Sequence, residues 1–180
     1  MSIINQALTN FLGGLGNYGI ILGVVAGGMM SIDMGGPFNK AAYVTATGLL
    51  ASGNYILMAA VMAGGMVPPL AIALSTTFFK NKWTEDERNA GLVNYIMGLS
   101  FISEGAIPFA ANDPIHVIPS CVLGSAIAGG LSVAFNCQLR APHGGVFVIA
   151  TVSNWPLYLL AIAAGSVVGC LVLSALKKAK

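Results

Sequence analysis

Charged residues are scarce in this 180-residue chain. Only 8% of its residues are charged, whereas 56% are hydrophobic and the mean hydropathy is +0.81. Water-soluble chains carry about 25% charged residues. The few charges are also spaced so that long runs contain none, as in Met1–Ile32, Ala41–Phe79 and Ala141–Leu176. This composition excludes a soluble domain and predicts a protein embedded in a membrane.

Motifs for metals, disulfides and nucleotides are also missing. The three cysteines, Cys121, Cys137 and Cys170, lie apart without paired spacing, so we interpret them as small packing residues rather than as zinc ligands or disulfides. No GxxxxGK[ST] loop is present, which fits a transporter that ATP does not drive directly. We therefore expect no metal and no cofactor.

The apolar runs predict the fold class. A bilayer core of about 30 Å requires roughly 20 apolar residues per helical crossing. We expect an all-α polytopic membrane protein, one domain over residues 1–180, with about five or six membrane-embedded helical segments and broken helices. A transmembrane β-barrel would alternate apolar and polar residues in segments of about ten, but these runs are apolar at consecutive positions.

Basic residues indicate the orientation, because short cytoplasmic loops collect Lys and Arg. They predict that the polar loop 80–90 and the tail 177–180 are cytoplasmic. The chain between them must then cross the membrane an even number of times, yet it holds three apolar stretches, Leu92–Phe109, Val117–Phe135 and Val146–Leu176. Either one stretch is a re-entrant hairpin or the longest breaks in two.

A single carboxylate lies inside one of these stretches. In FISEGAIPFAAN, residues 101–112, Glu104 is surrounded by apolar residues. An ionisable residue at membrane depth is costly and marks a functional site by default. Gly105 and Pro108 weaken the helix directly after it, and irregular backbone at depth is either buried in protein or lines a cavity. We therefore expect Glu104 and nearby backbone groups to bind a polar ligand.

Asp33 repeats this pattern upstream, in SIDMGGPFNKAAY. Pro37 and Phe38 follow Asp33 at the same spacing at which Pro108 and Phe109 follow Glu104. Paired segments interrupted by Gly and Pro point to the binding site in transporters built from repeats. The match is short, and two interpretations of Asp33 stay open. It either contacts the ligand directly or lies at the membrane edge, paired with Lys40.

Two histidines follow the acidic segments. His143 lies in RAPHGGVF, between a proline and two glycines and close to Arg140, and this setting fits a functional role as well as an interfacial one. His116 lies in NDPIHVIPS between Asp113 and Pro119, which favours a loop or interface role.

Several of these segments together resemble one family. DMGGPFNKAAY, FISEGAIPFAANDP, VIPS and APHGGVFV are similar to the membrane-embedded IIC component of bacterial fructose-type phosphotransferase systems (PTS). FISEGAIPF corresponds to the family signature FITEGAIPF, whose glutamate is implicated in holding sugar hydroxyls. The resemblance implies that Glu104 binds the sugar. It further implies a pocket shaped by Gly105, Ala106, Ile107, Pro108 and Phe109, with His143, Asn39 and Lys40 close to the sugar path.

This resemblance also implies a mechanism. A IIC component binds a fructose-like sugar, moves it across the bacterial inner membrane and presents a hydroxyl to the phosphocysteine of a cytoplasmic IIB protein. It works as a homodimer among membrane lipids, binds no nucleic acid and carries no phosphoryl group of its own. The chain would thus be the non-phosphorylated membrane subunit of a phosphotransferase complex.

The chain departs from the family pattern in three respects. It resembles only the carboxyl-terminal half of a IIC component, which implies that a separate amino-terminal half completes it. Ser103 replaces the usual threonine, and His116 stands where arginine is more frequent. Two alternatives stay open, namely an ion-coupled secondary transporter that uses Asp33 and Glu104, and an inactive or assembly-only fragment.

Overall fold

The described part of the chain is almost entirely helical. A computed structural model describes residue 10 and residues 19–178, so the beginning of the predicted stretch 1–32 and the end of the tail 177–180 lie outside it. The helices are α2 (Ile20–Ile32), α3 (Pro37–Ala51), α4 (Ile56–Phe78), α5 (Glu85–Leu99), α6 (Ile107–Asn112), α7 (Pro114–Ala134) and α8 (Trp155–Leu176). Short 3-10 turns are η1 (Lys80–Lys82), η2 (Ser103–Ala106) and η3 (Gly145–Thr151), and strands β1 (Gln138–Leu139) and β2 (Val152–Ser153) pair antiparallel. The predicted all-α class is confirmed.

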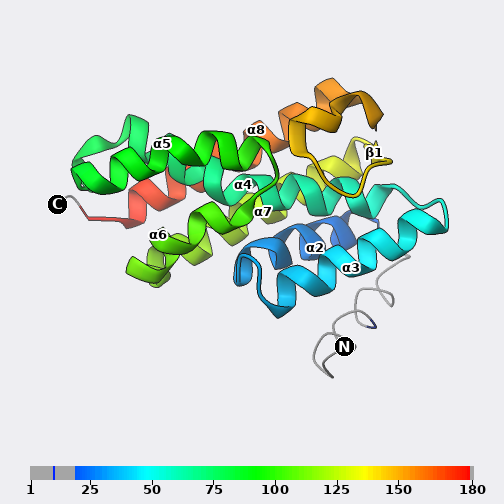
Figure 1. Cartoon of the computed structure of the whole chain (residues 1–180), viewed down its shortest axis with the longest axis horizontal. Coiled ribbons are helices and arrows are strands. Elements are labelled where there is room, and N and C mark those ends of the chain that lie inside the picture. Colours follow the sequence, from blue (N-terminus) through cyan, green and yellow to red (C-terminus); the bar gives the residue numbers. More distant parts are fainter. Residues whose placement is uncertain (1–9, 11–18, 179–180) are drawn as a thin grey trace.

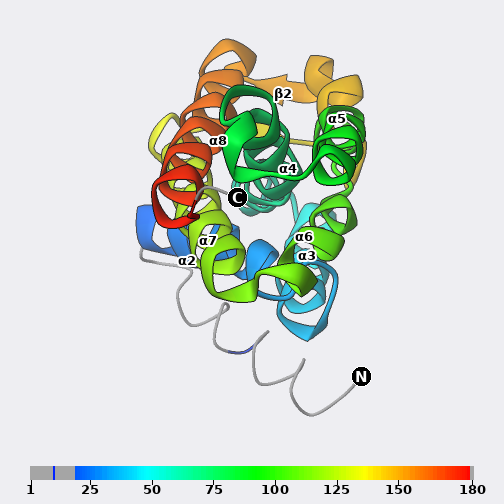
Figure 2. The ribbon, with the colours of Figure 1, turned by 90° about the vertical axis from the view of Figure 1, so that its left-hand side faces the viewer.

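Three helices of the described residues, α4, α7 and α8, are long and apolar enough to cross a membrane. The 23 residues of α4 correspond to a length of about 34 Å, which matches a bilayer core of about 30 Å. Nearly all of α4 is buried inside the protein, whereas α7 and α8 each turn about half of their residues outward. Figure 2, which looks along the bundle, shows α4 in the centre of the other helices.

The shorter helices form two hairpins that enter from opposite ends (Figure 1). The first hairpin is α2, residues 33–36 and α3, and the second is α5, residues 100–106 and α6. Both turn back beside the middle of α4. In the first hairpin, Gly27 lies so close to Gly64 of α4 that a Cβ atom on Gly64 would be 2.6 Å from the Gly27 Cα. In the second, the Ser103 hydroxyl donates a hydrogen bond of 2.8 Å to the Gly65 carbonyl.

The two predicted cytoplasmic segments lie at one end of the bundle, which we call the basic end. The Lys82 Nζ atom donates a 2.6 Å hydrogen bond to the Lys177 carbonyl. The Lys177 Nζ atom lies 3.0 Å from Asp113 Oδ2 and 4.2 Å from the centre of the Trp83 ring. Since Asp113 also lies here, the chain between Lys82 and Asp113 returns to the end from which it left. The stretch 92–109 therefore forms a helical hairpin, which agrees with the re-entrant alternative, while its placement in a membrane stays a prediction.

Asp113 is the centre of a charged network at the basic end. Its Oδ1 atom lies 2.6 Å from His116 Nδ1, which gives His116 a place in the helix-end network rather than in the hairpin tips. Burial would raise the pKa of Asp113, but hydrogen bonds and charge from Lys177 and His116 outweigh burial and hold that pKa below its ordinary value. The network fastens η1, the start of α7 and the end of α8 together.

The cysteines belong to the packed interior. Cys121, Cys137 and Cys170 are free thiols, and all three are buried. This placement agrees with their interpretation as packing residues.

Candidate functional site

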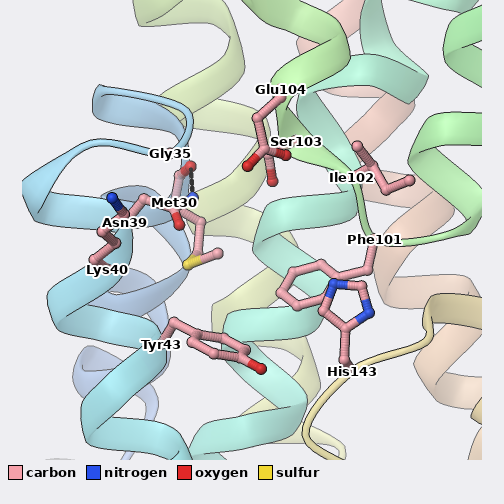
Figure 3. A pocket seen from close by; sticks show the side chains of 10 residues that line it. All are labelled: Met30, Gly35, Asn39, Lys40, Tyr43, Phe101, Ile102, Ser103, Glu104 and His143. Carbon is pink, nitrogen blue, oxygen red and sulfur yellow. Dashed lines mark hydrogen bonds between the residues drawn. The ribbon is translucent and has the colours of Figure 1, made fainter.

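A pocket of about 210 Å³ lies where the tips of the two hairpins meet (Figure 3). Its lining residues are Met30, Gly35, Asn39, Lys40 and Tyr43 from the first hairpin, Phe101, Ile102, Ser103 and Glu104 from the second, and His143 from the loop before η3. Pockets for drug-sized ligands are larger, about 300–1,000 Å³. The size and the mixed polar and apolar lining therefore suit a small polar molecule.

Glu104 points into this pocket from η2 (Figure 3). Its side chain is exposed to the pocket and faces Gly35, where an added Cβ atom would lie 3.3 Å from the Glu104 Oε1 atom. Gly35 has a φ of +125°, which side chains rarely adopt. A glycine is thus favoured at this position both by its backbone and by the room that the carboxylate needs.

The opposite wall supplies hydrogen-bond donors. Lys40 is exposed in the pocket, and the Asn39 side chain is oriented by a 2.9 Å hydrogen bond from its Nδ2 atom to the Met30 carbonyl. The carboxylate of Glu104, the amide of Asn39 and Lys40 therefore line one small space. Such a site can accept hydrogen bonds from some hydroxyl groups of a ligand and donate them to others.

Asp33 lies next to the pocket but not in its lining. Its carboxylate accepts hydrogen bonds from the backbone N–H groups of Phe38 at 2.7 Å and Asn39 at 3.0 Å, so it caps the first turn of α3. In the described part of the chain it forms no ion pair with Lys40. The geometry gives Asp33 a task in orienting Asn39, and its direct contact with a ligand stays a prediction.

An aromatic wall closes another side of the pocket. The Phe101 ring lies 5.0 Å from the His143 ring and 6.3 Å from the Tyr43 ring, measured between centroids. Aromatic rings offer flat apolar faces on which a ligand ring can pack. The wall thus complements the polar groups around Glu104.

Phe101 takes an unusual backbone conformation to reach this wall. Its φ is +64°, in the left-handed region. It ends α5 in a Schellman motif, with hydrogen bonds from Ile102 N to Met97 O at 2.8 Å and from Phe101 N to Gly98 O at 3.2 Å. The same motif ends α3 at Gly53 and α7 at Asn136, which are the residue types that usually occupy this position. Strain of this kind in a bulky residue indicates a functional constraint.

The residues after Glu104 lead away from the pocket. Gly105 packs so closely on Asn94 and Met97 that a Cβ atom there would force these side chains to shift. Ala106 and Phe109 are buried, and the Phe109 ring contacts the edge of Trp83 at a centroid distance of 5.7 Å. Ile107 and Pro108 are exposed outside the pocket lining. Their predicted part in shaping the site stays a prediction.

The structure thus brings four of the predicted residues, Glu104, His143, Asn39 and Lys40, into one pocket. Sequence reasoning missed the rest of the lining. Tyr43 follows Asn39 by four residues, a spacing that places both on one face of a helix and could have indicated it. Phe101 carried no comparable signal. Among the described residues no group of His, Cys, Asp and Glu is arranged to hold a metal ion.

Comparison with known proteins decides the family. The model of the family described as "Phosphotransferase system, EIIC" matches residues 1–124, which include both hairpin tips and Glu104. The chain belongs to the phosphotransferase system EIIC family. The expected kinship with fructose-type IIC components is confirmed, and an EIIC membrane protein agrees with the three long apolar helices.

Three relatives illustrate this kinship. The chain is 56% identical over 182 residues to the PTS system fructose-specific EIIB'BC component of Rhodobacter capsulatus, covering 99% of the chain and 32% of the relative. It is 54% identical to the fructose permease IIC component of Bacillus amyloliquefaciens, covering 95% of the chain and 56% of the relative. It is 46% identical to the PTS system fructose-specific EIIC component of Haloferax volcanii, covering 98% and 48%. The chain therefore spans about a third to a half of these relatives, and no solved structure matches it.

Proposed function

We propose that this EIIC chain forms the sugar-binding part of a PTS permease for fructose or a fructose-like sugar. The pocket between the hairpin tips carries the proposal. It lies beside the middle of α4, and it places a carboxylate, an ammonium group and an aromatic wall around a space of about 210 Å³. A monosaccharide presents hydroxyl groups at its edge and an apolar face, which matches this lining.

Glu104 has the main binding role in this proposal. A carboxylate accepts hydrogen bonds from two hydroxyl groups at once, and charge-assisted hydrogen bonds are about twice as strong as neutral ones. Lys40 and Asn39 donate to sugar oxygens from the other side. Phe101, Tyr43 and His143 pack on the sugar and determine which ring shapes fit. None of these groups needs to react, because their task is to hold and orient the sugar.

The phosphoryl group comes from a partner in this proposal. The names of several relatives, such as the EIIB'BC component of Rhodobacter capsulatus and the EIIABC component of Bacillus subtilis, join EIIB and EIIC parts in one protein. The chain would use a IIB phosphocysteine at its basic end, where Lys80, Lys82 and Lys178 make the cytoplasmic side attractive to a phosphorylated partner. The rest of a IIC domain, a second copy of the chain and inner-membrane lipid would complete the assembly.

The test is phosphoenolpyruvate-dependent phosphorylation of labelled fructose by membranes that contain the chain, the soluble phosphoryl carriers and a fructose-type IIB protein. Hydrogen bonds to a charged group contribute about 1.5–3 kcal/mol, so Glu104→Gln is expected to weaken fructose binding roughly tenfold to a hundredfold. Glu85→Gln is the matched control, because Glu85 is an exposed acid at the start of α5.

Four outcomes separate the alternatives. Sugar phosphate formed with the native chain and lost with Glu104→Gln supports the proposal. Uptake of unphosphorylated sugar driven by an ion gradient would contradict it and favour a secondary transporter. If neither chain gives product, adding the amino-terminal half of a IIC component distinguishes half of a permease from an inactive fragment. Equal binding by both chains would remove Glu104 from the site.

A further inference from the structure

Two adjacent prolines lie inside the central helix. Pro68 and Pro69 are buried in the middle of α4. Proline has no N–H group, so the carbonyl oxygens four residues earlier, those of Gly64 and Gly65, lack the donor that they would have in a regular helix. Both glycines are buried as well. At membrane depth no bulk water can satisfy such a carbonyl, so another protein group must donate to it.

Serine hydroxyls from neighbouring elements fill both places. Ser103 in the tip of the second hairpin donates to the Gly65 carbonyl at 2.8 Å, and Ser125 of α7 donates to the Gly64 carbonyl at 2.7 Å. All the atoms involved belong to buried residues. The Ser125 hydroxyl donates its proton to the Gly64 carbonyl. In its contact with Ser31, at the end of α2, Ser125 therefore accepts the hydrogen bond. The Gly65 carbonyl therefore holds the second hairpin directly, and the Gly64 carbonyl holds the first hairpin through Ser125 of α7.

Gly65 fixes the second tip in a further way. The Phe101 ring packs so closely on Gly65 that a Cβ atom there would overlap it. Ser103 and Phe101 thus both contact Gly65 of α4 and attach the tip of the second hairpin there. Glu104 directly follows Ser103 in the chain. From this geometry we infer that Ser103, bonded to the carbonyl that Pro69 frees, positions Glu104 in the pocket. What Glu104 binds there rests on the proposed function, but the anchor itself does not.

The first experiment measures fructose affinity for the chain in membranes. Ser103→Ala removes the hydroxyl and releases the tip, so affinity is expected to fall about tenfold, since a displaced Glu104 loses well-aligned charge-assisted hydrogen bonds to the sugar. Ser103→Thr keeps the hydroxyl and is expected to restore affinity. Ser174→Ala is the matched control, because it removes a buried 2.8 Å hydrogen bond between Ser174 and Ser75, outside the pocket lining.

A second experiment tests the partner of Ser103 without any sugar. Pro69→Ala supplies an N–H group that can bond the Gly65 carbonyl directly. The loss of thermal stability caused by Ser103→Ala should then be smaller in the Pro69→Ala background than in the native chain. An equal loss in both backgrounds would show that the Gly65 carbonyl is not what Ser103 holds.

A third measurement reports the position of residue 104 itself. The three native cysteines are buried, so Glu104→Cys introduces a pocket thiol whose rate of maleimide labelling can be followed. Adding Ser103→Ala is expected to change that rate severalfold, whereas Ser174→Ala leaves it as it was. An unchanged rate, or a fructose affinity that Ser103→Ala does not alter, would overturn the positioning role. If the native chain binds no fructose, the proposed function fails while the labelling and stability results still decide the anchor.

Discussion

The backbone of Phe101 predicts that glycine is more stable than alanine at this position, although alanine is usually the more stable of the two in a helix. Phe101 has a φ of +64° at the end of α5. A left-handed conformation costs a residue with a side chain roughly 1–2 kcal/mol, and glycine avoids this cost. In the opposite direction, alanine lowers the conformational entropy of the unfolded chain, which stabilises the folded protein by about 0.4–1 kcal/mol relative to glycine. Phe101→Gly should therefore be more stable than Phe101→Ala by about 1 kcal/mol, because both variants lose the same ring and only their backbones differ.

The assay is chemical unfolding of both variants in detergent, followed by helical circular dichroism. Leu99 provides the control of opposite sign. It ends α5 with a helical backbone, where alanine is expected to be more stable than glycine by about 1 kcal/mol. If Phe101→Ala is as stable as Phe101→Gly, the left-handed backbone at residue 101 is not strained and the reasoning is wrong. Both variants lose the Phe101 ring from the aromatic wall, so both should bind fructose more weakly than the native chain whichever is more stable.

Two further predictions concern the carboxylates outside the pocket lining. Asp33→Ala removes the acceptor for Phe38 and Asn39 and should lower the free energy of unfolding in detergent by about 1 kcal/mol, with a smaller loss for Asp33→Asn. For Asp113, the folded protein lowers the pKa below the ordinary value of 3.8, so its stabilising effect is complete above that pH and is lost as the pH falls through the lowered pKa. Stability measured against pH should therefore drop in this acidic range, and Asp113→Asn should flatten that drop.

The polar part of the site was predicted from the sequence on different grounds. Glu104 stood out because a carboxylate is rare at membrane depth, His143 stood out by its setting next to proline, glycine and Arg140, and Asn39 and Lys40 were expected from the family resemblance. All four line one pocket. The short acid-x-x-x-Pro-Phe match also has a structural counterpart. Asp33 and Glu104 lie at the tips of the two hairpins, and Pro37 and Pro108 open the helices that follow. The charge of Asp33 and Glu104 could reveal these two residues, since a carboxylate is costly at membrane depth.

The course of the chain was less predictable. Counting basic residues predicted that one of three stretches fails to cross, but the count could not say which one. The stretch 92–109 turns at Ser100 and Phe101, where serine is only a weak turn signal and phenylalanine is none. Phe101 keeps its left-handed backbone because contacts with Gly65, Tyr43 and His143 hold its ring, and these partners are distant in the sequence.

The same limit explains why the anchor of the pocket escapes a search for polar side chains. α4 has no charged residue, and from the sequence alone the two prolines in its middle would predict a break in the helix. In the fold they free two carbonyl acceptors: the Gly65 carbonyl binds Ser103 of the second hairpin, and the Gly64 carbonyl binds Ser125 of α7, which in turn contacts Ser31 of the first hairpin. A backbone carbonyl can accept a hydrogen bond without any buried charged group, and its position is fixed by the helix that runs through the bundle. Glu104 can therefore lie on a short, strained turn, because the rigid helix that positions this turn, α4, comes from another part of the chain.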